Sequence, residues 1–422
     1  MTEWIGATEA AERLGIKPAS LYAYVSRGVL SRRREADGRA SMFDAAEVEE
    51  LARRGRPRRP VGGSELVFES ALTELTETCQ RYRGLDATDL ALRCSFEEVA
   101  MLLWTGSLPD RSAAADPSRP GWQATAEALA AGRAAQAALP AGTLPLERLQ
   151  VIVPALAATD QFRLHLDLPA VVAAGQSLVA GMTGALPDAG GGRAPTGPQA
   201  RSEAAPADPE DGVAARLAPK LCQQPVSAGL IRVLNAALVL VADHELAAST
   251  LAARVAASMR ADPYAVVATG LGAMGGALHG GAALGAELML SSASSPADAP
   301  RVVGDLLRRG EKLPGFGHFV YKGGDPRANL LLRLIADLEP ESPQLAIAAA
   351  VTDEARRRAL PEPNIEFALA VLVGVAGMVR GAGEAIFATG RTAGWLAHAF
   401  EEYQRNIPIR PRSVYTGPTA VT

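Results

Sequence analysis

Three histidines stand in sequence contexts that suit chemistry better than packing. His318 lies in LPGFGHFVYKGGDPRANL (313–330), His279 lies in GGALHGGAALG, and His244 lies in ADHELAAST. Glycines beside a histidine allow the backbone and a ligand to approach each other closely. Any one of the three could simply be a hydrogen-bonded, partly buried side chain. Because the 422 residues contain only five histidines, their joint occurrence favours a ligand site.

Charged residues follow His318 within the same run. Lys322, Asp325 and Arg327 come directly after its glycines. A core helix or strand has little use for such a composition, whereas guanidinium groups match carboxylates in a bidentate geometry. The run therefore predicts a loop that meets an anionic ligand.

The composition predicts a mainly helical protein of two or three domains. Apolar residues make up 48% of the chain and aromatic residues only 5%, and abundant alanine favours helices over sheets. The net charge is −4. Residues 1–60 hold 12 basic and 9 acidic residues, a local charge of +3, which leaves −7 for the remainder. The positive charge is therefore concentrated at the N-terminal end.

The cysteines and the N-terminal segment predict a cytoplasmic protein. The three cysteines lack metal-ligand spacing, which predicts a reduced compartment and no metal site. The first residues, MTEWIGATEAAERLG, carry acids and no long apolar run, so no signal peptide is expected. Nor is any stretch expected to be long and apolar enough to span a bilayer.

Residues 1–55 predict a helix, a tight turn, a second helix, a hairpin and a third helix. Asp37 and Gly38 mark the hairpin turn, and Asp44 with Glu47 predicts a capping box for the third helix. This order resembles the winged helix-turn-helix domain of MerR and excisionase proteins. Four residues on the expected wing could contact DNA phosphates, namely Arg32, Arg33, Arg34 and Arg39. A protein-interaction domain with a solvated charged face is the alternative.

The remainder of the chain has a simpler predicted organisation. Residues 56–63 form an Arg/Pro/Gly linker, and residues 186–212 are expected to be a flexible surface loop. From residue 64 to residue 422 apolar residues recur at helical spacing. The expected fold is therefore mainly α.

Six segments resemble the citrate synthase family and follow one another in its order. They are YRGLDATDLALRCSFEEVAMLLWTGSLP, ADHELAASTLAARVAAS, GALHGGA, PGFGHFVYKGGDPRA, PNIEF and FATGRTAGWLAHAFEE with RPRSVYTG. The resemblance implies a helical fold with a large and a small domain, the small one at roughly 280–370. It also implies condensation of acetyl-CoA, or another short acyl-CoA, with oxaloacetate and hydrolysis of the thioester, with no other cofactor.

The resemblance assigns a role to each group that this chemistry requires. The carboxylate base that removes the acyl proton would be Glu366. His279 would donate to the enol oxygen and His318 would polarise the ketone. The residues expected to hold oxaloacetate are His244, Arg327, Arg391 and Arg410, the last reaching across a homodimer into the partner's site.

The resemblance also assigns the residues that meet CoA. The backbone from Leu313 through Gly315 to Gly317 would lie around the adenine, and Lys322 could meet a phosphate. A solvated lysine is an equally good interpretation of Lys322.

Three features depart from the family pattern. The motif that usually reads PN-x-D-F is PNIEF here, so the base is a glutamate, one methylene longer than aspartate. Ala283 replaces the asparagine that usually follows HGGA. The strand-rich start of the family domain is poorly matched by SELVFESALTELTETCQRYRG.

Two further functions compete with the enzyme. One is a DNA-binding regulator whose synthase-like body senses oxaloacetate or acyl-CoA, which the N-terminal head and Glu366 favour. The other is a structural partner of another synthase subunit. Three histidines and three clamp arginines occur together, and a sensor has less need of the complete acid-base set, so the enzyme is preferred.

Overall fold

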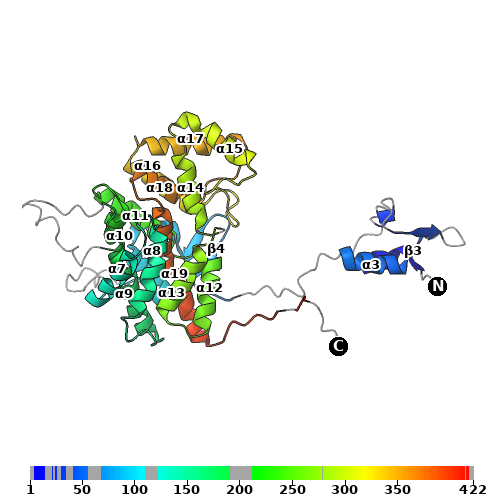
Figure 1. Cartoon of the computed structure of the whole chain (residues 1–422), viewed down its shortest axis with the longest axis horizontal. Coiled ribbons are helices and arrows are strands. Elements are labelled where there is room, and N and C mark those ends of the chain that lie inside the picture. The colour runs from blue at the N-terminus through cyan, green and yellow to red at the C-terminus, as the bar shows by residue number, and fades with distance from the viewer. Residues whose placement is uncertain are drawn as a thin grey trace, which may run out of the picture. The chain divides into compact units, whose positions relative to one another are not determined.

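The computed structural model describes residues 4–14, 21, 24–25, 30–34, 41–55, 68–109, 122–190, 212–277, 279–413 and 415–417 (Figure 1). Its contacts divide the chain into two compact units, residues 1–69 with 411–422 and residues 70–410. The predicted linker at 56–63 and most of the predicted loop at 186–212 lie outside the described residues.

The N-terminal unit contains a small antiparallel sheet with the strand order β1-β3-β2. Its strands are β1 (Trp4–Gly6), β2 (Arg32–Arg34) and β3 (Ser41–Asp44), and its helices are α1 (Ala7–Leu14) and α3 (Ala45–Gly55). Buried apolar side chains join these elements into one core, among them Ile5, Ala10, Leu21, Phe43 and Val48. The first helix, the hairpin arms and the third helix were therefore predicted correctly.

The predicted capping box of α3 differs in the structure, and the predicted second helix lies mostly outside the described residues. Asp44 caps α3, because its Oδ1 accepts from the backbone N–H groups of Ala46 and Glu47. The Glu47 carboxylate does not complete a capping box but accepts from the N–H and the hydroxyl of Ser31, which tie it to the chain before β2. Most of the predicted second helix lies outside the described residues, as does Arg39.

The larger unit begins with a second antiparallel sheet. Its strands are β4 (Thr73–Leu75), β5 (Gln80–Tyr82) and β6 (Leu85–Asp86), in the order β4-β5-β6. The expectation that this segment lacks the strand-rich start of the family was therefore wrong. The strands are too short to show an alternating pattern, and the turn between β5 and β6 depends on positive φ angles at Arg83 and Gly84.

Helices form almost all of the rest of the described larger unit, and many begin at a side-chain cap. Ser95 forms a capping box with Glu98, while Asp262 and Asn364 accept from backbone N–H groups of the first turn. The helices are α4 (Ala87–Arg93), α5 (Phe96–Thr105), α7 (Ala126–Ala137), α8 (Pro145–Ala157), α9 (Leu168–Ala185), α10 (Val213–Leu221), α11 (Ala228–Leu240), α12 (Ala248–Ser258), α13 (Pro263–Met274), α14 (Gly281–Ser291), α15 (Ala299–Arg308), α16 (Pro326–Leu338), α17 (Pro343–Arg357), α18 (Ile365–Val375) and α19 (Ala382–Arg405), with a short 3₁₀ turn at Pro296–Asp298.

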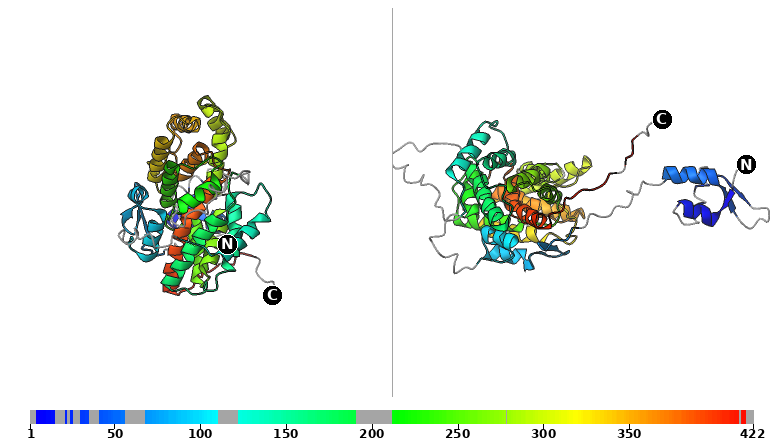
Figure 2. Two further views of the ribbon diagram at one scale, coloured as in Figure 1. Left: turned by 90° about the vertical axis from the view of Figure 1, so that its left-hand side faces the viewer. Right: turned by 90° about the horizontal axis from the view of Figure 1, so that it is seen from below.

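Helix α19 is the central element of this unit. It is buried along most of its length, and the two views of Figure 2 show it, in red, packed among the other helices. Gly390 and Gly394 allow the segment after α11 to approach its backbone. At Gly394, for example, an added Cβ would lie 2.5 Å from the carbonyl oxygen of Ala242. This close approach brings the 241–244 segment beside the part of α19 that carries Arg391.

Helices α14 to α18 form a group at one end of the larger unit (Figure 1). Within it α18 packs against α14, α16 and α17, and α15 packs against α17. The loop that carries His318 leads into α16, and Glu366 lies in the first turn of α18. The group therefore contributes one wall of the site, and α12 to α13 and α19 contribute the other.

The expectation that no stretch is long and apolar enough to span a bilayer was wrong for helix α9. Residues 168–185 are long and apolar enough to cross a membrane by length and composition, with 56% of that window buried within the structure. A buried core helix passes the same test.

Candidate active site

The loop at 313–318 is held in place by the segment that precedes α18. Gly315 and Gly317 have φ angles of +79° and +81°, which glycine adopts without steric cost. The N–H of Asn364 donates to the Gly315 carbonyl at 2.9 Å, and the N–H of Gly317 donates to the Glu362 carbonyl at 2.8 Å. This pairing fixes His318 relative to Glu366, two residues beyond Asn364.

The hydrogen bonds of His318 define its tautomer. Its Nδ1 accepts from the backbone N–H groups of Val320 at 3.0 Å and Tyr321 at 3.3 Å, whereas its Nε2 lies 3.5 Å from Arg327 Nη2. The two shorter contacts to Nδ1 assign the ring proton to Nε2. Burial, reinforced by the charge of Arg327, lowers the pKa of His318 to about 4. His318 is therefore a neutral imidazole at pH 7 whose Nε2–H can donate to a ligand.

Arg327 is buried and held by a bidentate ion pair. Its Nε and Nη2 donate to the two oxygens of Asp325 at 3.0 and 2.8 Å. Asp325 also caps α16 and accepts from the N–H of Ile365 at the start of α18. Arg327 Nη1 has no hydrogen-bond partner among the described residues, so it is available to a carboxylate ligand.

His244 is linked to β5 through a tyrosine that the sequence analysis did not identify. His244 Nε2 lies 3.2 Å from the hydroxyl of Tyr321, which donates to Gln80 Oε1 at 3.2 Å. Because that hydroxyl donates to Gln80, it accepts from His244. The ring of His244 lies edge-on to that of His318 at 5.0 Å between centroids. Burial and the charges of Arg327 and Arg391 lower the pKa of His244, so this second imidazole is also neutral.

Arg391 enters the site from α19. Its Nε donates to the carbonyl of Val241 at 2.8 Å, and its guanidinium lies over the ring of Phe387 at 4.6 Å. The side chain is almost completely buried. Within the described part of the chain its terminal nitrogens have no hydrogen-bond partner, which leaves them available to an anionic ligand.

His279 lies at the start of α14 and contacts α12. Its Nε2 is 2.7 Å from the Ser249 hydroxyl, which accepts from the indole N–H of Trp395 at 3.3 Å. The Ser249 hydroxyl can therefore donate to His279 Nε2, which places the ring proton on Nδ1. Burial and the charge of Arg391 lower the pKa of His279 and keep it neutral.

Glu366 shares a narrow cavity with His279. The cavity is lined by Met274, His279, Gly280, Ala283, Glu366, Glu384 and Phe387, and it is too narrow for a water molecule. Oε2 of Glu366 is buried without a hydrogen-bond partner in the described structure. Burial raises the pKa of Glu366, and the charges of Arg327 and Arg391 oppose that rise. An unpartnered carboxylate of raised basicity in a dry cavity can act as a base toward a bound carbon acid.

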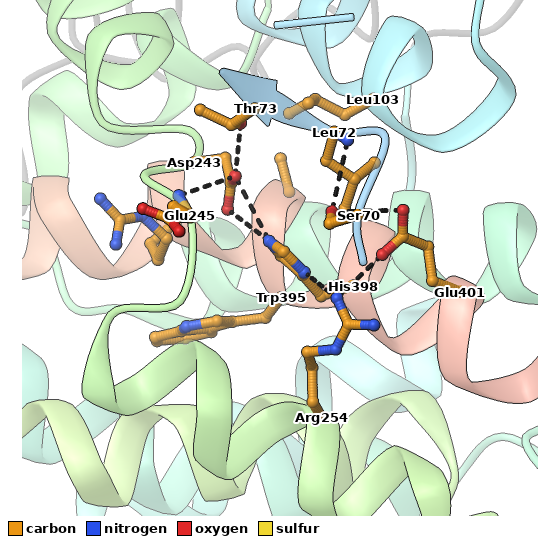
Figure 3. Close-up of polar contacts among 12 residues, drawn as sticks. Ser70, Leu72, Thr73, Leu103, Asp243, Glu245, Arg254, Trp395, His398 and Glu401 are labelled. Carbon is orange, nitrogen blue, oxygen red and sulfur yellow. Dashed lines mark hydrogen bonds and ion pairs between the residues drawn. The ribbon is translucent and has the colours of Figure 1, made fainter. Parts of the chain in front are cut away.

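A buried chain of polar groups supports the segment that carries His244 (Figure 3). Asp243 accepts from the Thr73 hydroxyl at 2.5 Å and from His398 Nε2 at 3.3 Å. His398 Nδ1 accepts from Arg254 at 2.8 Å, and Arg254 pairs with Glu401 at 2.8 Å and also with Glu402. This chain connects α12 and α19 to the residue immediately before His244.

Only two of the four residues predicted to bind CoA line the same hollow. Leu313 and Gly317 line a hollow of about 520 Å³ with Phe316, His318 and Pro361. Gly315 instead packs against Phe367, where an added Cβ would lie 2.8 Å from the phenylalanine Cβ. Lys322 is exposed, and its Nζ lies 3.4 Å from the carbonyl of His318.

Arg410 does not join the cluster of its own chain. It is exposed in the extended segment that follows α19, where the N–H of neighbouring Ile409 donates to the Ser258 hydroxyl at 3.1 Å.

The side chains of only two of the four predicted wing arginines are described. Arg32 and Arg33 are exposed on β2, Arg34 is described only in its backbone, and Arg39 lies outside the described residues.

The supporting residues that sequence reasoning missed are Ser249, Tyr321, Gln80 and Asp243, and Asp325 was noted only as a charged residue of the run without a supporting role. Asp325 and Tyr321 lie in the same run as His318, and Asp243 directly precedes His244, so proximity was an available signal. Gln80 and Ser249 offered none. Among the residues that the structure describes, no group of His, Cys, Asp or Glu could hold a metal ion.

Comparisons with known proteins agree on one family. The family described as "Citrate synthase, C-terminal domain" matches residues 64–412. Citrate synthase 2 of Bacillus subtilis is 31% identical over 380 residues, 83% of this chain and 93% of that protein. The 2-methylcitrate synthase of Mycobacterium tuberculosis is 30% identical over 352 residues, 80% of this chain and 84% of that protein.

Solved structures show the same likeness. Citrate synthase from Thermotoga maritima has a TM-score of 0.67 at 27% identity, over 86% of this chain and 97% of that one. The ternary complex of Thermoplasma acidophilum citrate synthase with carboxymethyl coenzyme A and oxaloacetate has a TM-score of 0.69 at 26% identity, over 84% of this chain and 95% of that one.

Proposed function

This chain belongs to the citrate synthase family, and from that premise we propose that it condenses a short acyl-CoA with oxaloacetate and hydrolyses the resulting thioester. The relatives make it an enzyme of the citrate (Si)-synthase type, for which acyl-CoA is a substrate and no further cofactor is needed. The expected location remains the cytoplasm.

The first step is formation of the enol. Glu366 takes a proton from the carbon next to the thioester, and neutral His279 donates to the thioester oxygen as negative charge develops there. The observation that carries the proposal is the shared cavity: the unpartnered oxygen of Glu366 belongs to the same dry pocket as neutral His279.

The second step is attack of the enol carbon on the ketone of oxaloacetate. The Nε2–H of His318 is the donor that polarises the ketone, while Arg327 and Arg391 bind the two carboxylates. Support comes from the partly unsatisfied guanidinium groups of both arginines and from the neutral tautomer of His318. His244, supported by Tyr321, lies edge-on to His318 and would hold the ketoacid.

CoA binding would use the hollow beside His318. Leu313 and Gly317 would bring backbone and apolar surface to the adenine, and Lys322 would meet a phosphate from the rim. The proposal includes both acetyl-CoA and propionyl-CoA as substrates, because both citrate synthases and a 2-methylcitrate synthase are among the relatives.

Release of free CoA thiol tests the function directly. Purified protein is mixed with oxaloacetate and acetyl-, propionyl- or butyryl-CoA, and we expect thiol release with at least one of them. His279→Ala should remove turnover while oxaloacetate binding persists. Intact oxaloacetate binding with no thiol release from the unaltered protein would instead indicate a sensor.

The proposed active form is a homodimer in which Arg410 completes the partner's site. Helix α12 exposes Leu251 and Val255, and its C-cap residue Met259 follows at the same interval of four residues, with exposed fractions of 36%, 38% and 66%. Such a stripe of exposed apolar side chains is suited to a subunit interface. The position of Arg410 outside its own cluster fits a role in a second subunit.

A second activity is proposed for the N-terminal unit, which we infer is a winged helix-turn-helix domain that binds DNA. The specific observation is the pair of exposed arginines on β2, next to the hairpin, in a small sheet packed with α1 and α3. Arg33 lies over the ring of Trp4 at 4.5 Å, which orients it on the surface. Affinity for duplex DNA should fall steeply with salt, and a flat response would contradict the proposal.

A further inference from the structure

The cavity of Glu366 and His279 has a second carboxyl in its wall. Glu384, in the first turn of α19, lines this cavity together with Phe387 and Ala283. The residue is only 5% exposed. Its carboxyl has no hydrogen-bond partner among the described residues, although its oxygens, unlike Oε2 of Glu366, keep a small accessible surface. A buried carboxyl in that condition is unfavourable unless it is neutral or meets a ligand.

The groups around Glu384 determine which carboxyl carries a proton. Glu287, on α14, accepts from the N–H groups of Gly381 at 2.8 Å and Gly383 at 3.1 Å, and these two donors oppose the rise in the pKa of Glu287 that its burial causes. Glu147, at the start of α8, likewise accepts from a backbone N–H at 2.7 Å. Burial and these two anions raise the pKa of Glu384 to about 7. Below about pH 7 Glu384 is therefore mostly protonated and can donate a hydrogen bond.

Glu366 differs from Glu384 in the charges around it. Burial raises the pKa of Glu366 as well, but the charges of Arg327 and Arg391 oppose that rise and favour the ionised form. Of the other nearby groups, Asp325 raises the pKa of Glu366 but is paired with Arg327. His279 is neutral, and the charge of Arg380 acts on Glu287. Burial raises the pKa of both carboxyls, but only Glu366 has two guanidinium charges that oppose the rise, and carboxyls in such different surroundings can divide the roles of base and acid.

We propose that Glu384 is a further catalytic residue of the reaction proposed above. When the acyl group enters and the side chains that close the cavity move apart, the neutral carboxyl of Glu384 donates a hydrogen bond to the thioester oxygen beside His279. In this step the C–H bond next to the thioester breaks, its proton moves to Glu366, and the electron pair forms the enol double bond. The negative charge gathers on the thioester oxygen, where both donors stabilise it. Glu384 keeps its proton, so no other reactant is needed.

Two substitutions separate the donor from the charge. Glu384→Gln keeps a donor of the same length but cannot ionise, and Glu384→Leu removes the donor. In the full-length protein, kcat/KM of the unaltered enzyme should fall as the pH rises above about 7, because ionised Glu384 can no longer donate. The glutamine variant should lose that alkaline decline and retain most of the rate at pH 7. The leucine variant should lose on the order of 10²-fold in kcat, with oxaloacetate affinity unchanged.

Glu341→Gln, at an exposed position between α16 and α17, is the matched control and should keep the alkaline decline. The infrared C=O band of a protonated carboxyl at neutral pH should be present in the unaltered protein and missing from Glu384→Gln. Full activity in the leucine variant, an alkaline decline that persists in the glutamine variant, or an unchanged infrared band would each overturn the proposal while thiol release continues. Absence of thiol release from the unaltered protein would overturn the proposed function with it.

Discussion

At the residue scale, His318 depends on being neutral. Its Nδ1 accepts two backbone N–H groups, and protonation of that atom would break both hydrogen bonds. Its pKa is about 4 in the folded chain against 6.5 in an unperturbed histidine. Between these values the unfolded chain binds a proton that the folded chain does not. The contribution of His318 to stability is therefore complete above about pH 6.5 and is lost as the pH falls toward 4.

His318→Gln should remove this dependence. Between pH 7 and pH 4 the unaltered protein should lose about 2–3 kcal/mol more free energy of unfolding than the variant. Urea unfolding at each pH measures the difference. His165→Gln, at an exposed position, serves as the control. Equal pH dependence in the unaltered protein and His318→Gln would show that His318 is not held neutral.

Glu366→Asp tests whether the glutamate suits its cavity. The shorter side chain would withdraw the carboxylate by one methylene from a cavity that it shares with His279. We expect kcat to fall about 10²-fold, because small displacements of a base are costly, and Glu366→Gln to be inactive. Steady-state thiol release measures both. A gain in rate with aspartate would instead identify the natural glutamate as a poorly placed base.

How far these residues could be predicted depends on whether their partners lie nearby in the sequence. The histidines and arginines stand in distinctive glycine- and charge-rich runs, and the structure brings His244, His279, His318, Arg327 and Arg391 into one region with Glu366. Tyr321 could be read only as part of a loop, since its partners Gln80 and His244 are 241 and 77 residues away. Whether Glu384 is paired or alone is likewise decided by tertiary packing.

At the element scale, close packing of α19 against the 238–243 segment positions the site. Gly394→Ala would place a Cβ against Asp243 Oδ1 and 2.5 Å from the carbonyl oxygen of Ala242. We expect a loss of about 1–3 kcal/mol in stability and a higher KM for oxaloacetate, because displacement of Asp243 moves the adjacent His244. Chemical unfolding and steady-state kinetics measure the two effects.

Gly272→Ala on α13 is the matched control, since nothing lies within 4 Å of its added Cβ. It should raise stability by about 0.5–1 kcal/mol, because alanine is the better helix former, and leave KM unchanged. If both alanine variants behave alike, close packing at Gly394 does not position His244.

Elements were predicted best where local chemistry alone defines them. Helix α1 and the Asp44 cap of α3 follow from residues adjacent in sequence. The strands β4 to β6 were missed because they are two or three residues long and depend on long-range contacts, such as the Tyr82 hydroxyl that donates to the Val239 carbonyl at 2.9 Å. Glu47 was assigned to a local cap, but its carboxylate is used by Ser31 sixteen residues away.

At the scale of the whole molecule, the exposed stripe on α12 predicts subunit association. Val255→Asp would place a charge in the middle of the stripe, and desolvating that charge would oppose association. We expect the variant to sediment as a monomer and to lose thiol release. Leu92→Asp, at a 57% exposed position on α4, should remain dimeric and active. A dimeric Val255→Asp variant would exclude this face as the interface.

Complementation between two inactive variants tests whether Arg410 acts in the partner's site. Arg410→Ala and His279→Ala should each abolish turnover alone. In a mixed dimer, the chain with Arg410→Ala keeps its own His279 and receives Arg410 from the other chain, so one of the two sites is complete. Random mixing after dissociation and reassociation should therefore restore about a quarter of the unaltered activity. If Arg410 served its own chain, each site in the mixed dimer would still lack one group and the mixture would stay inactive.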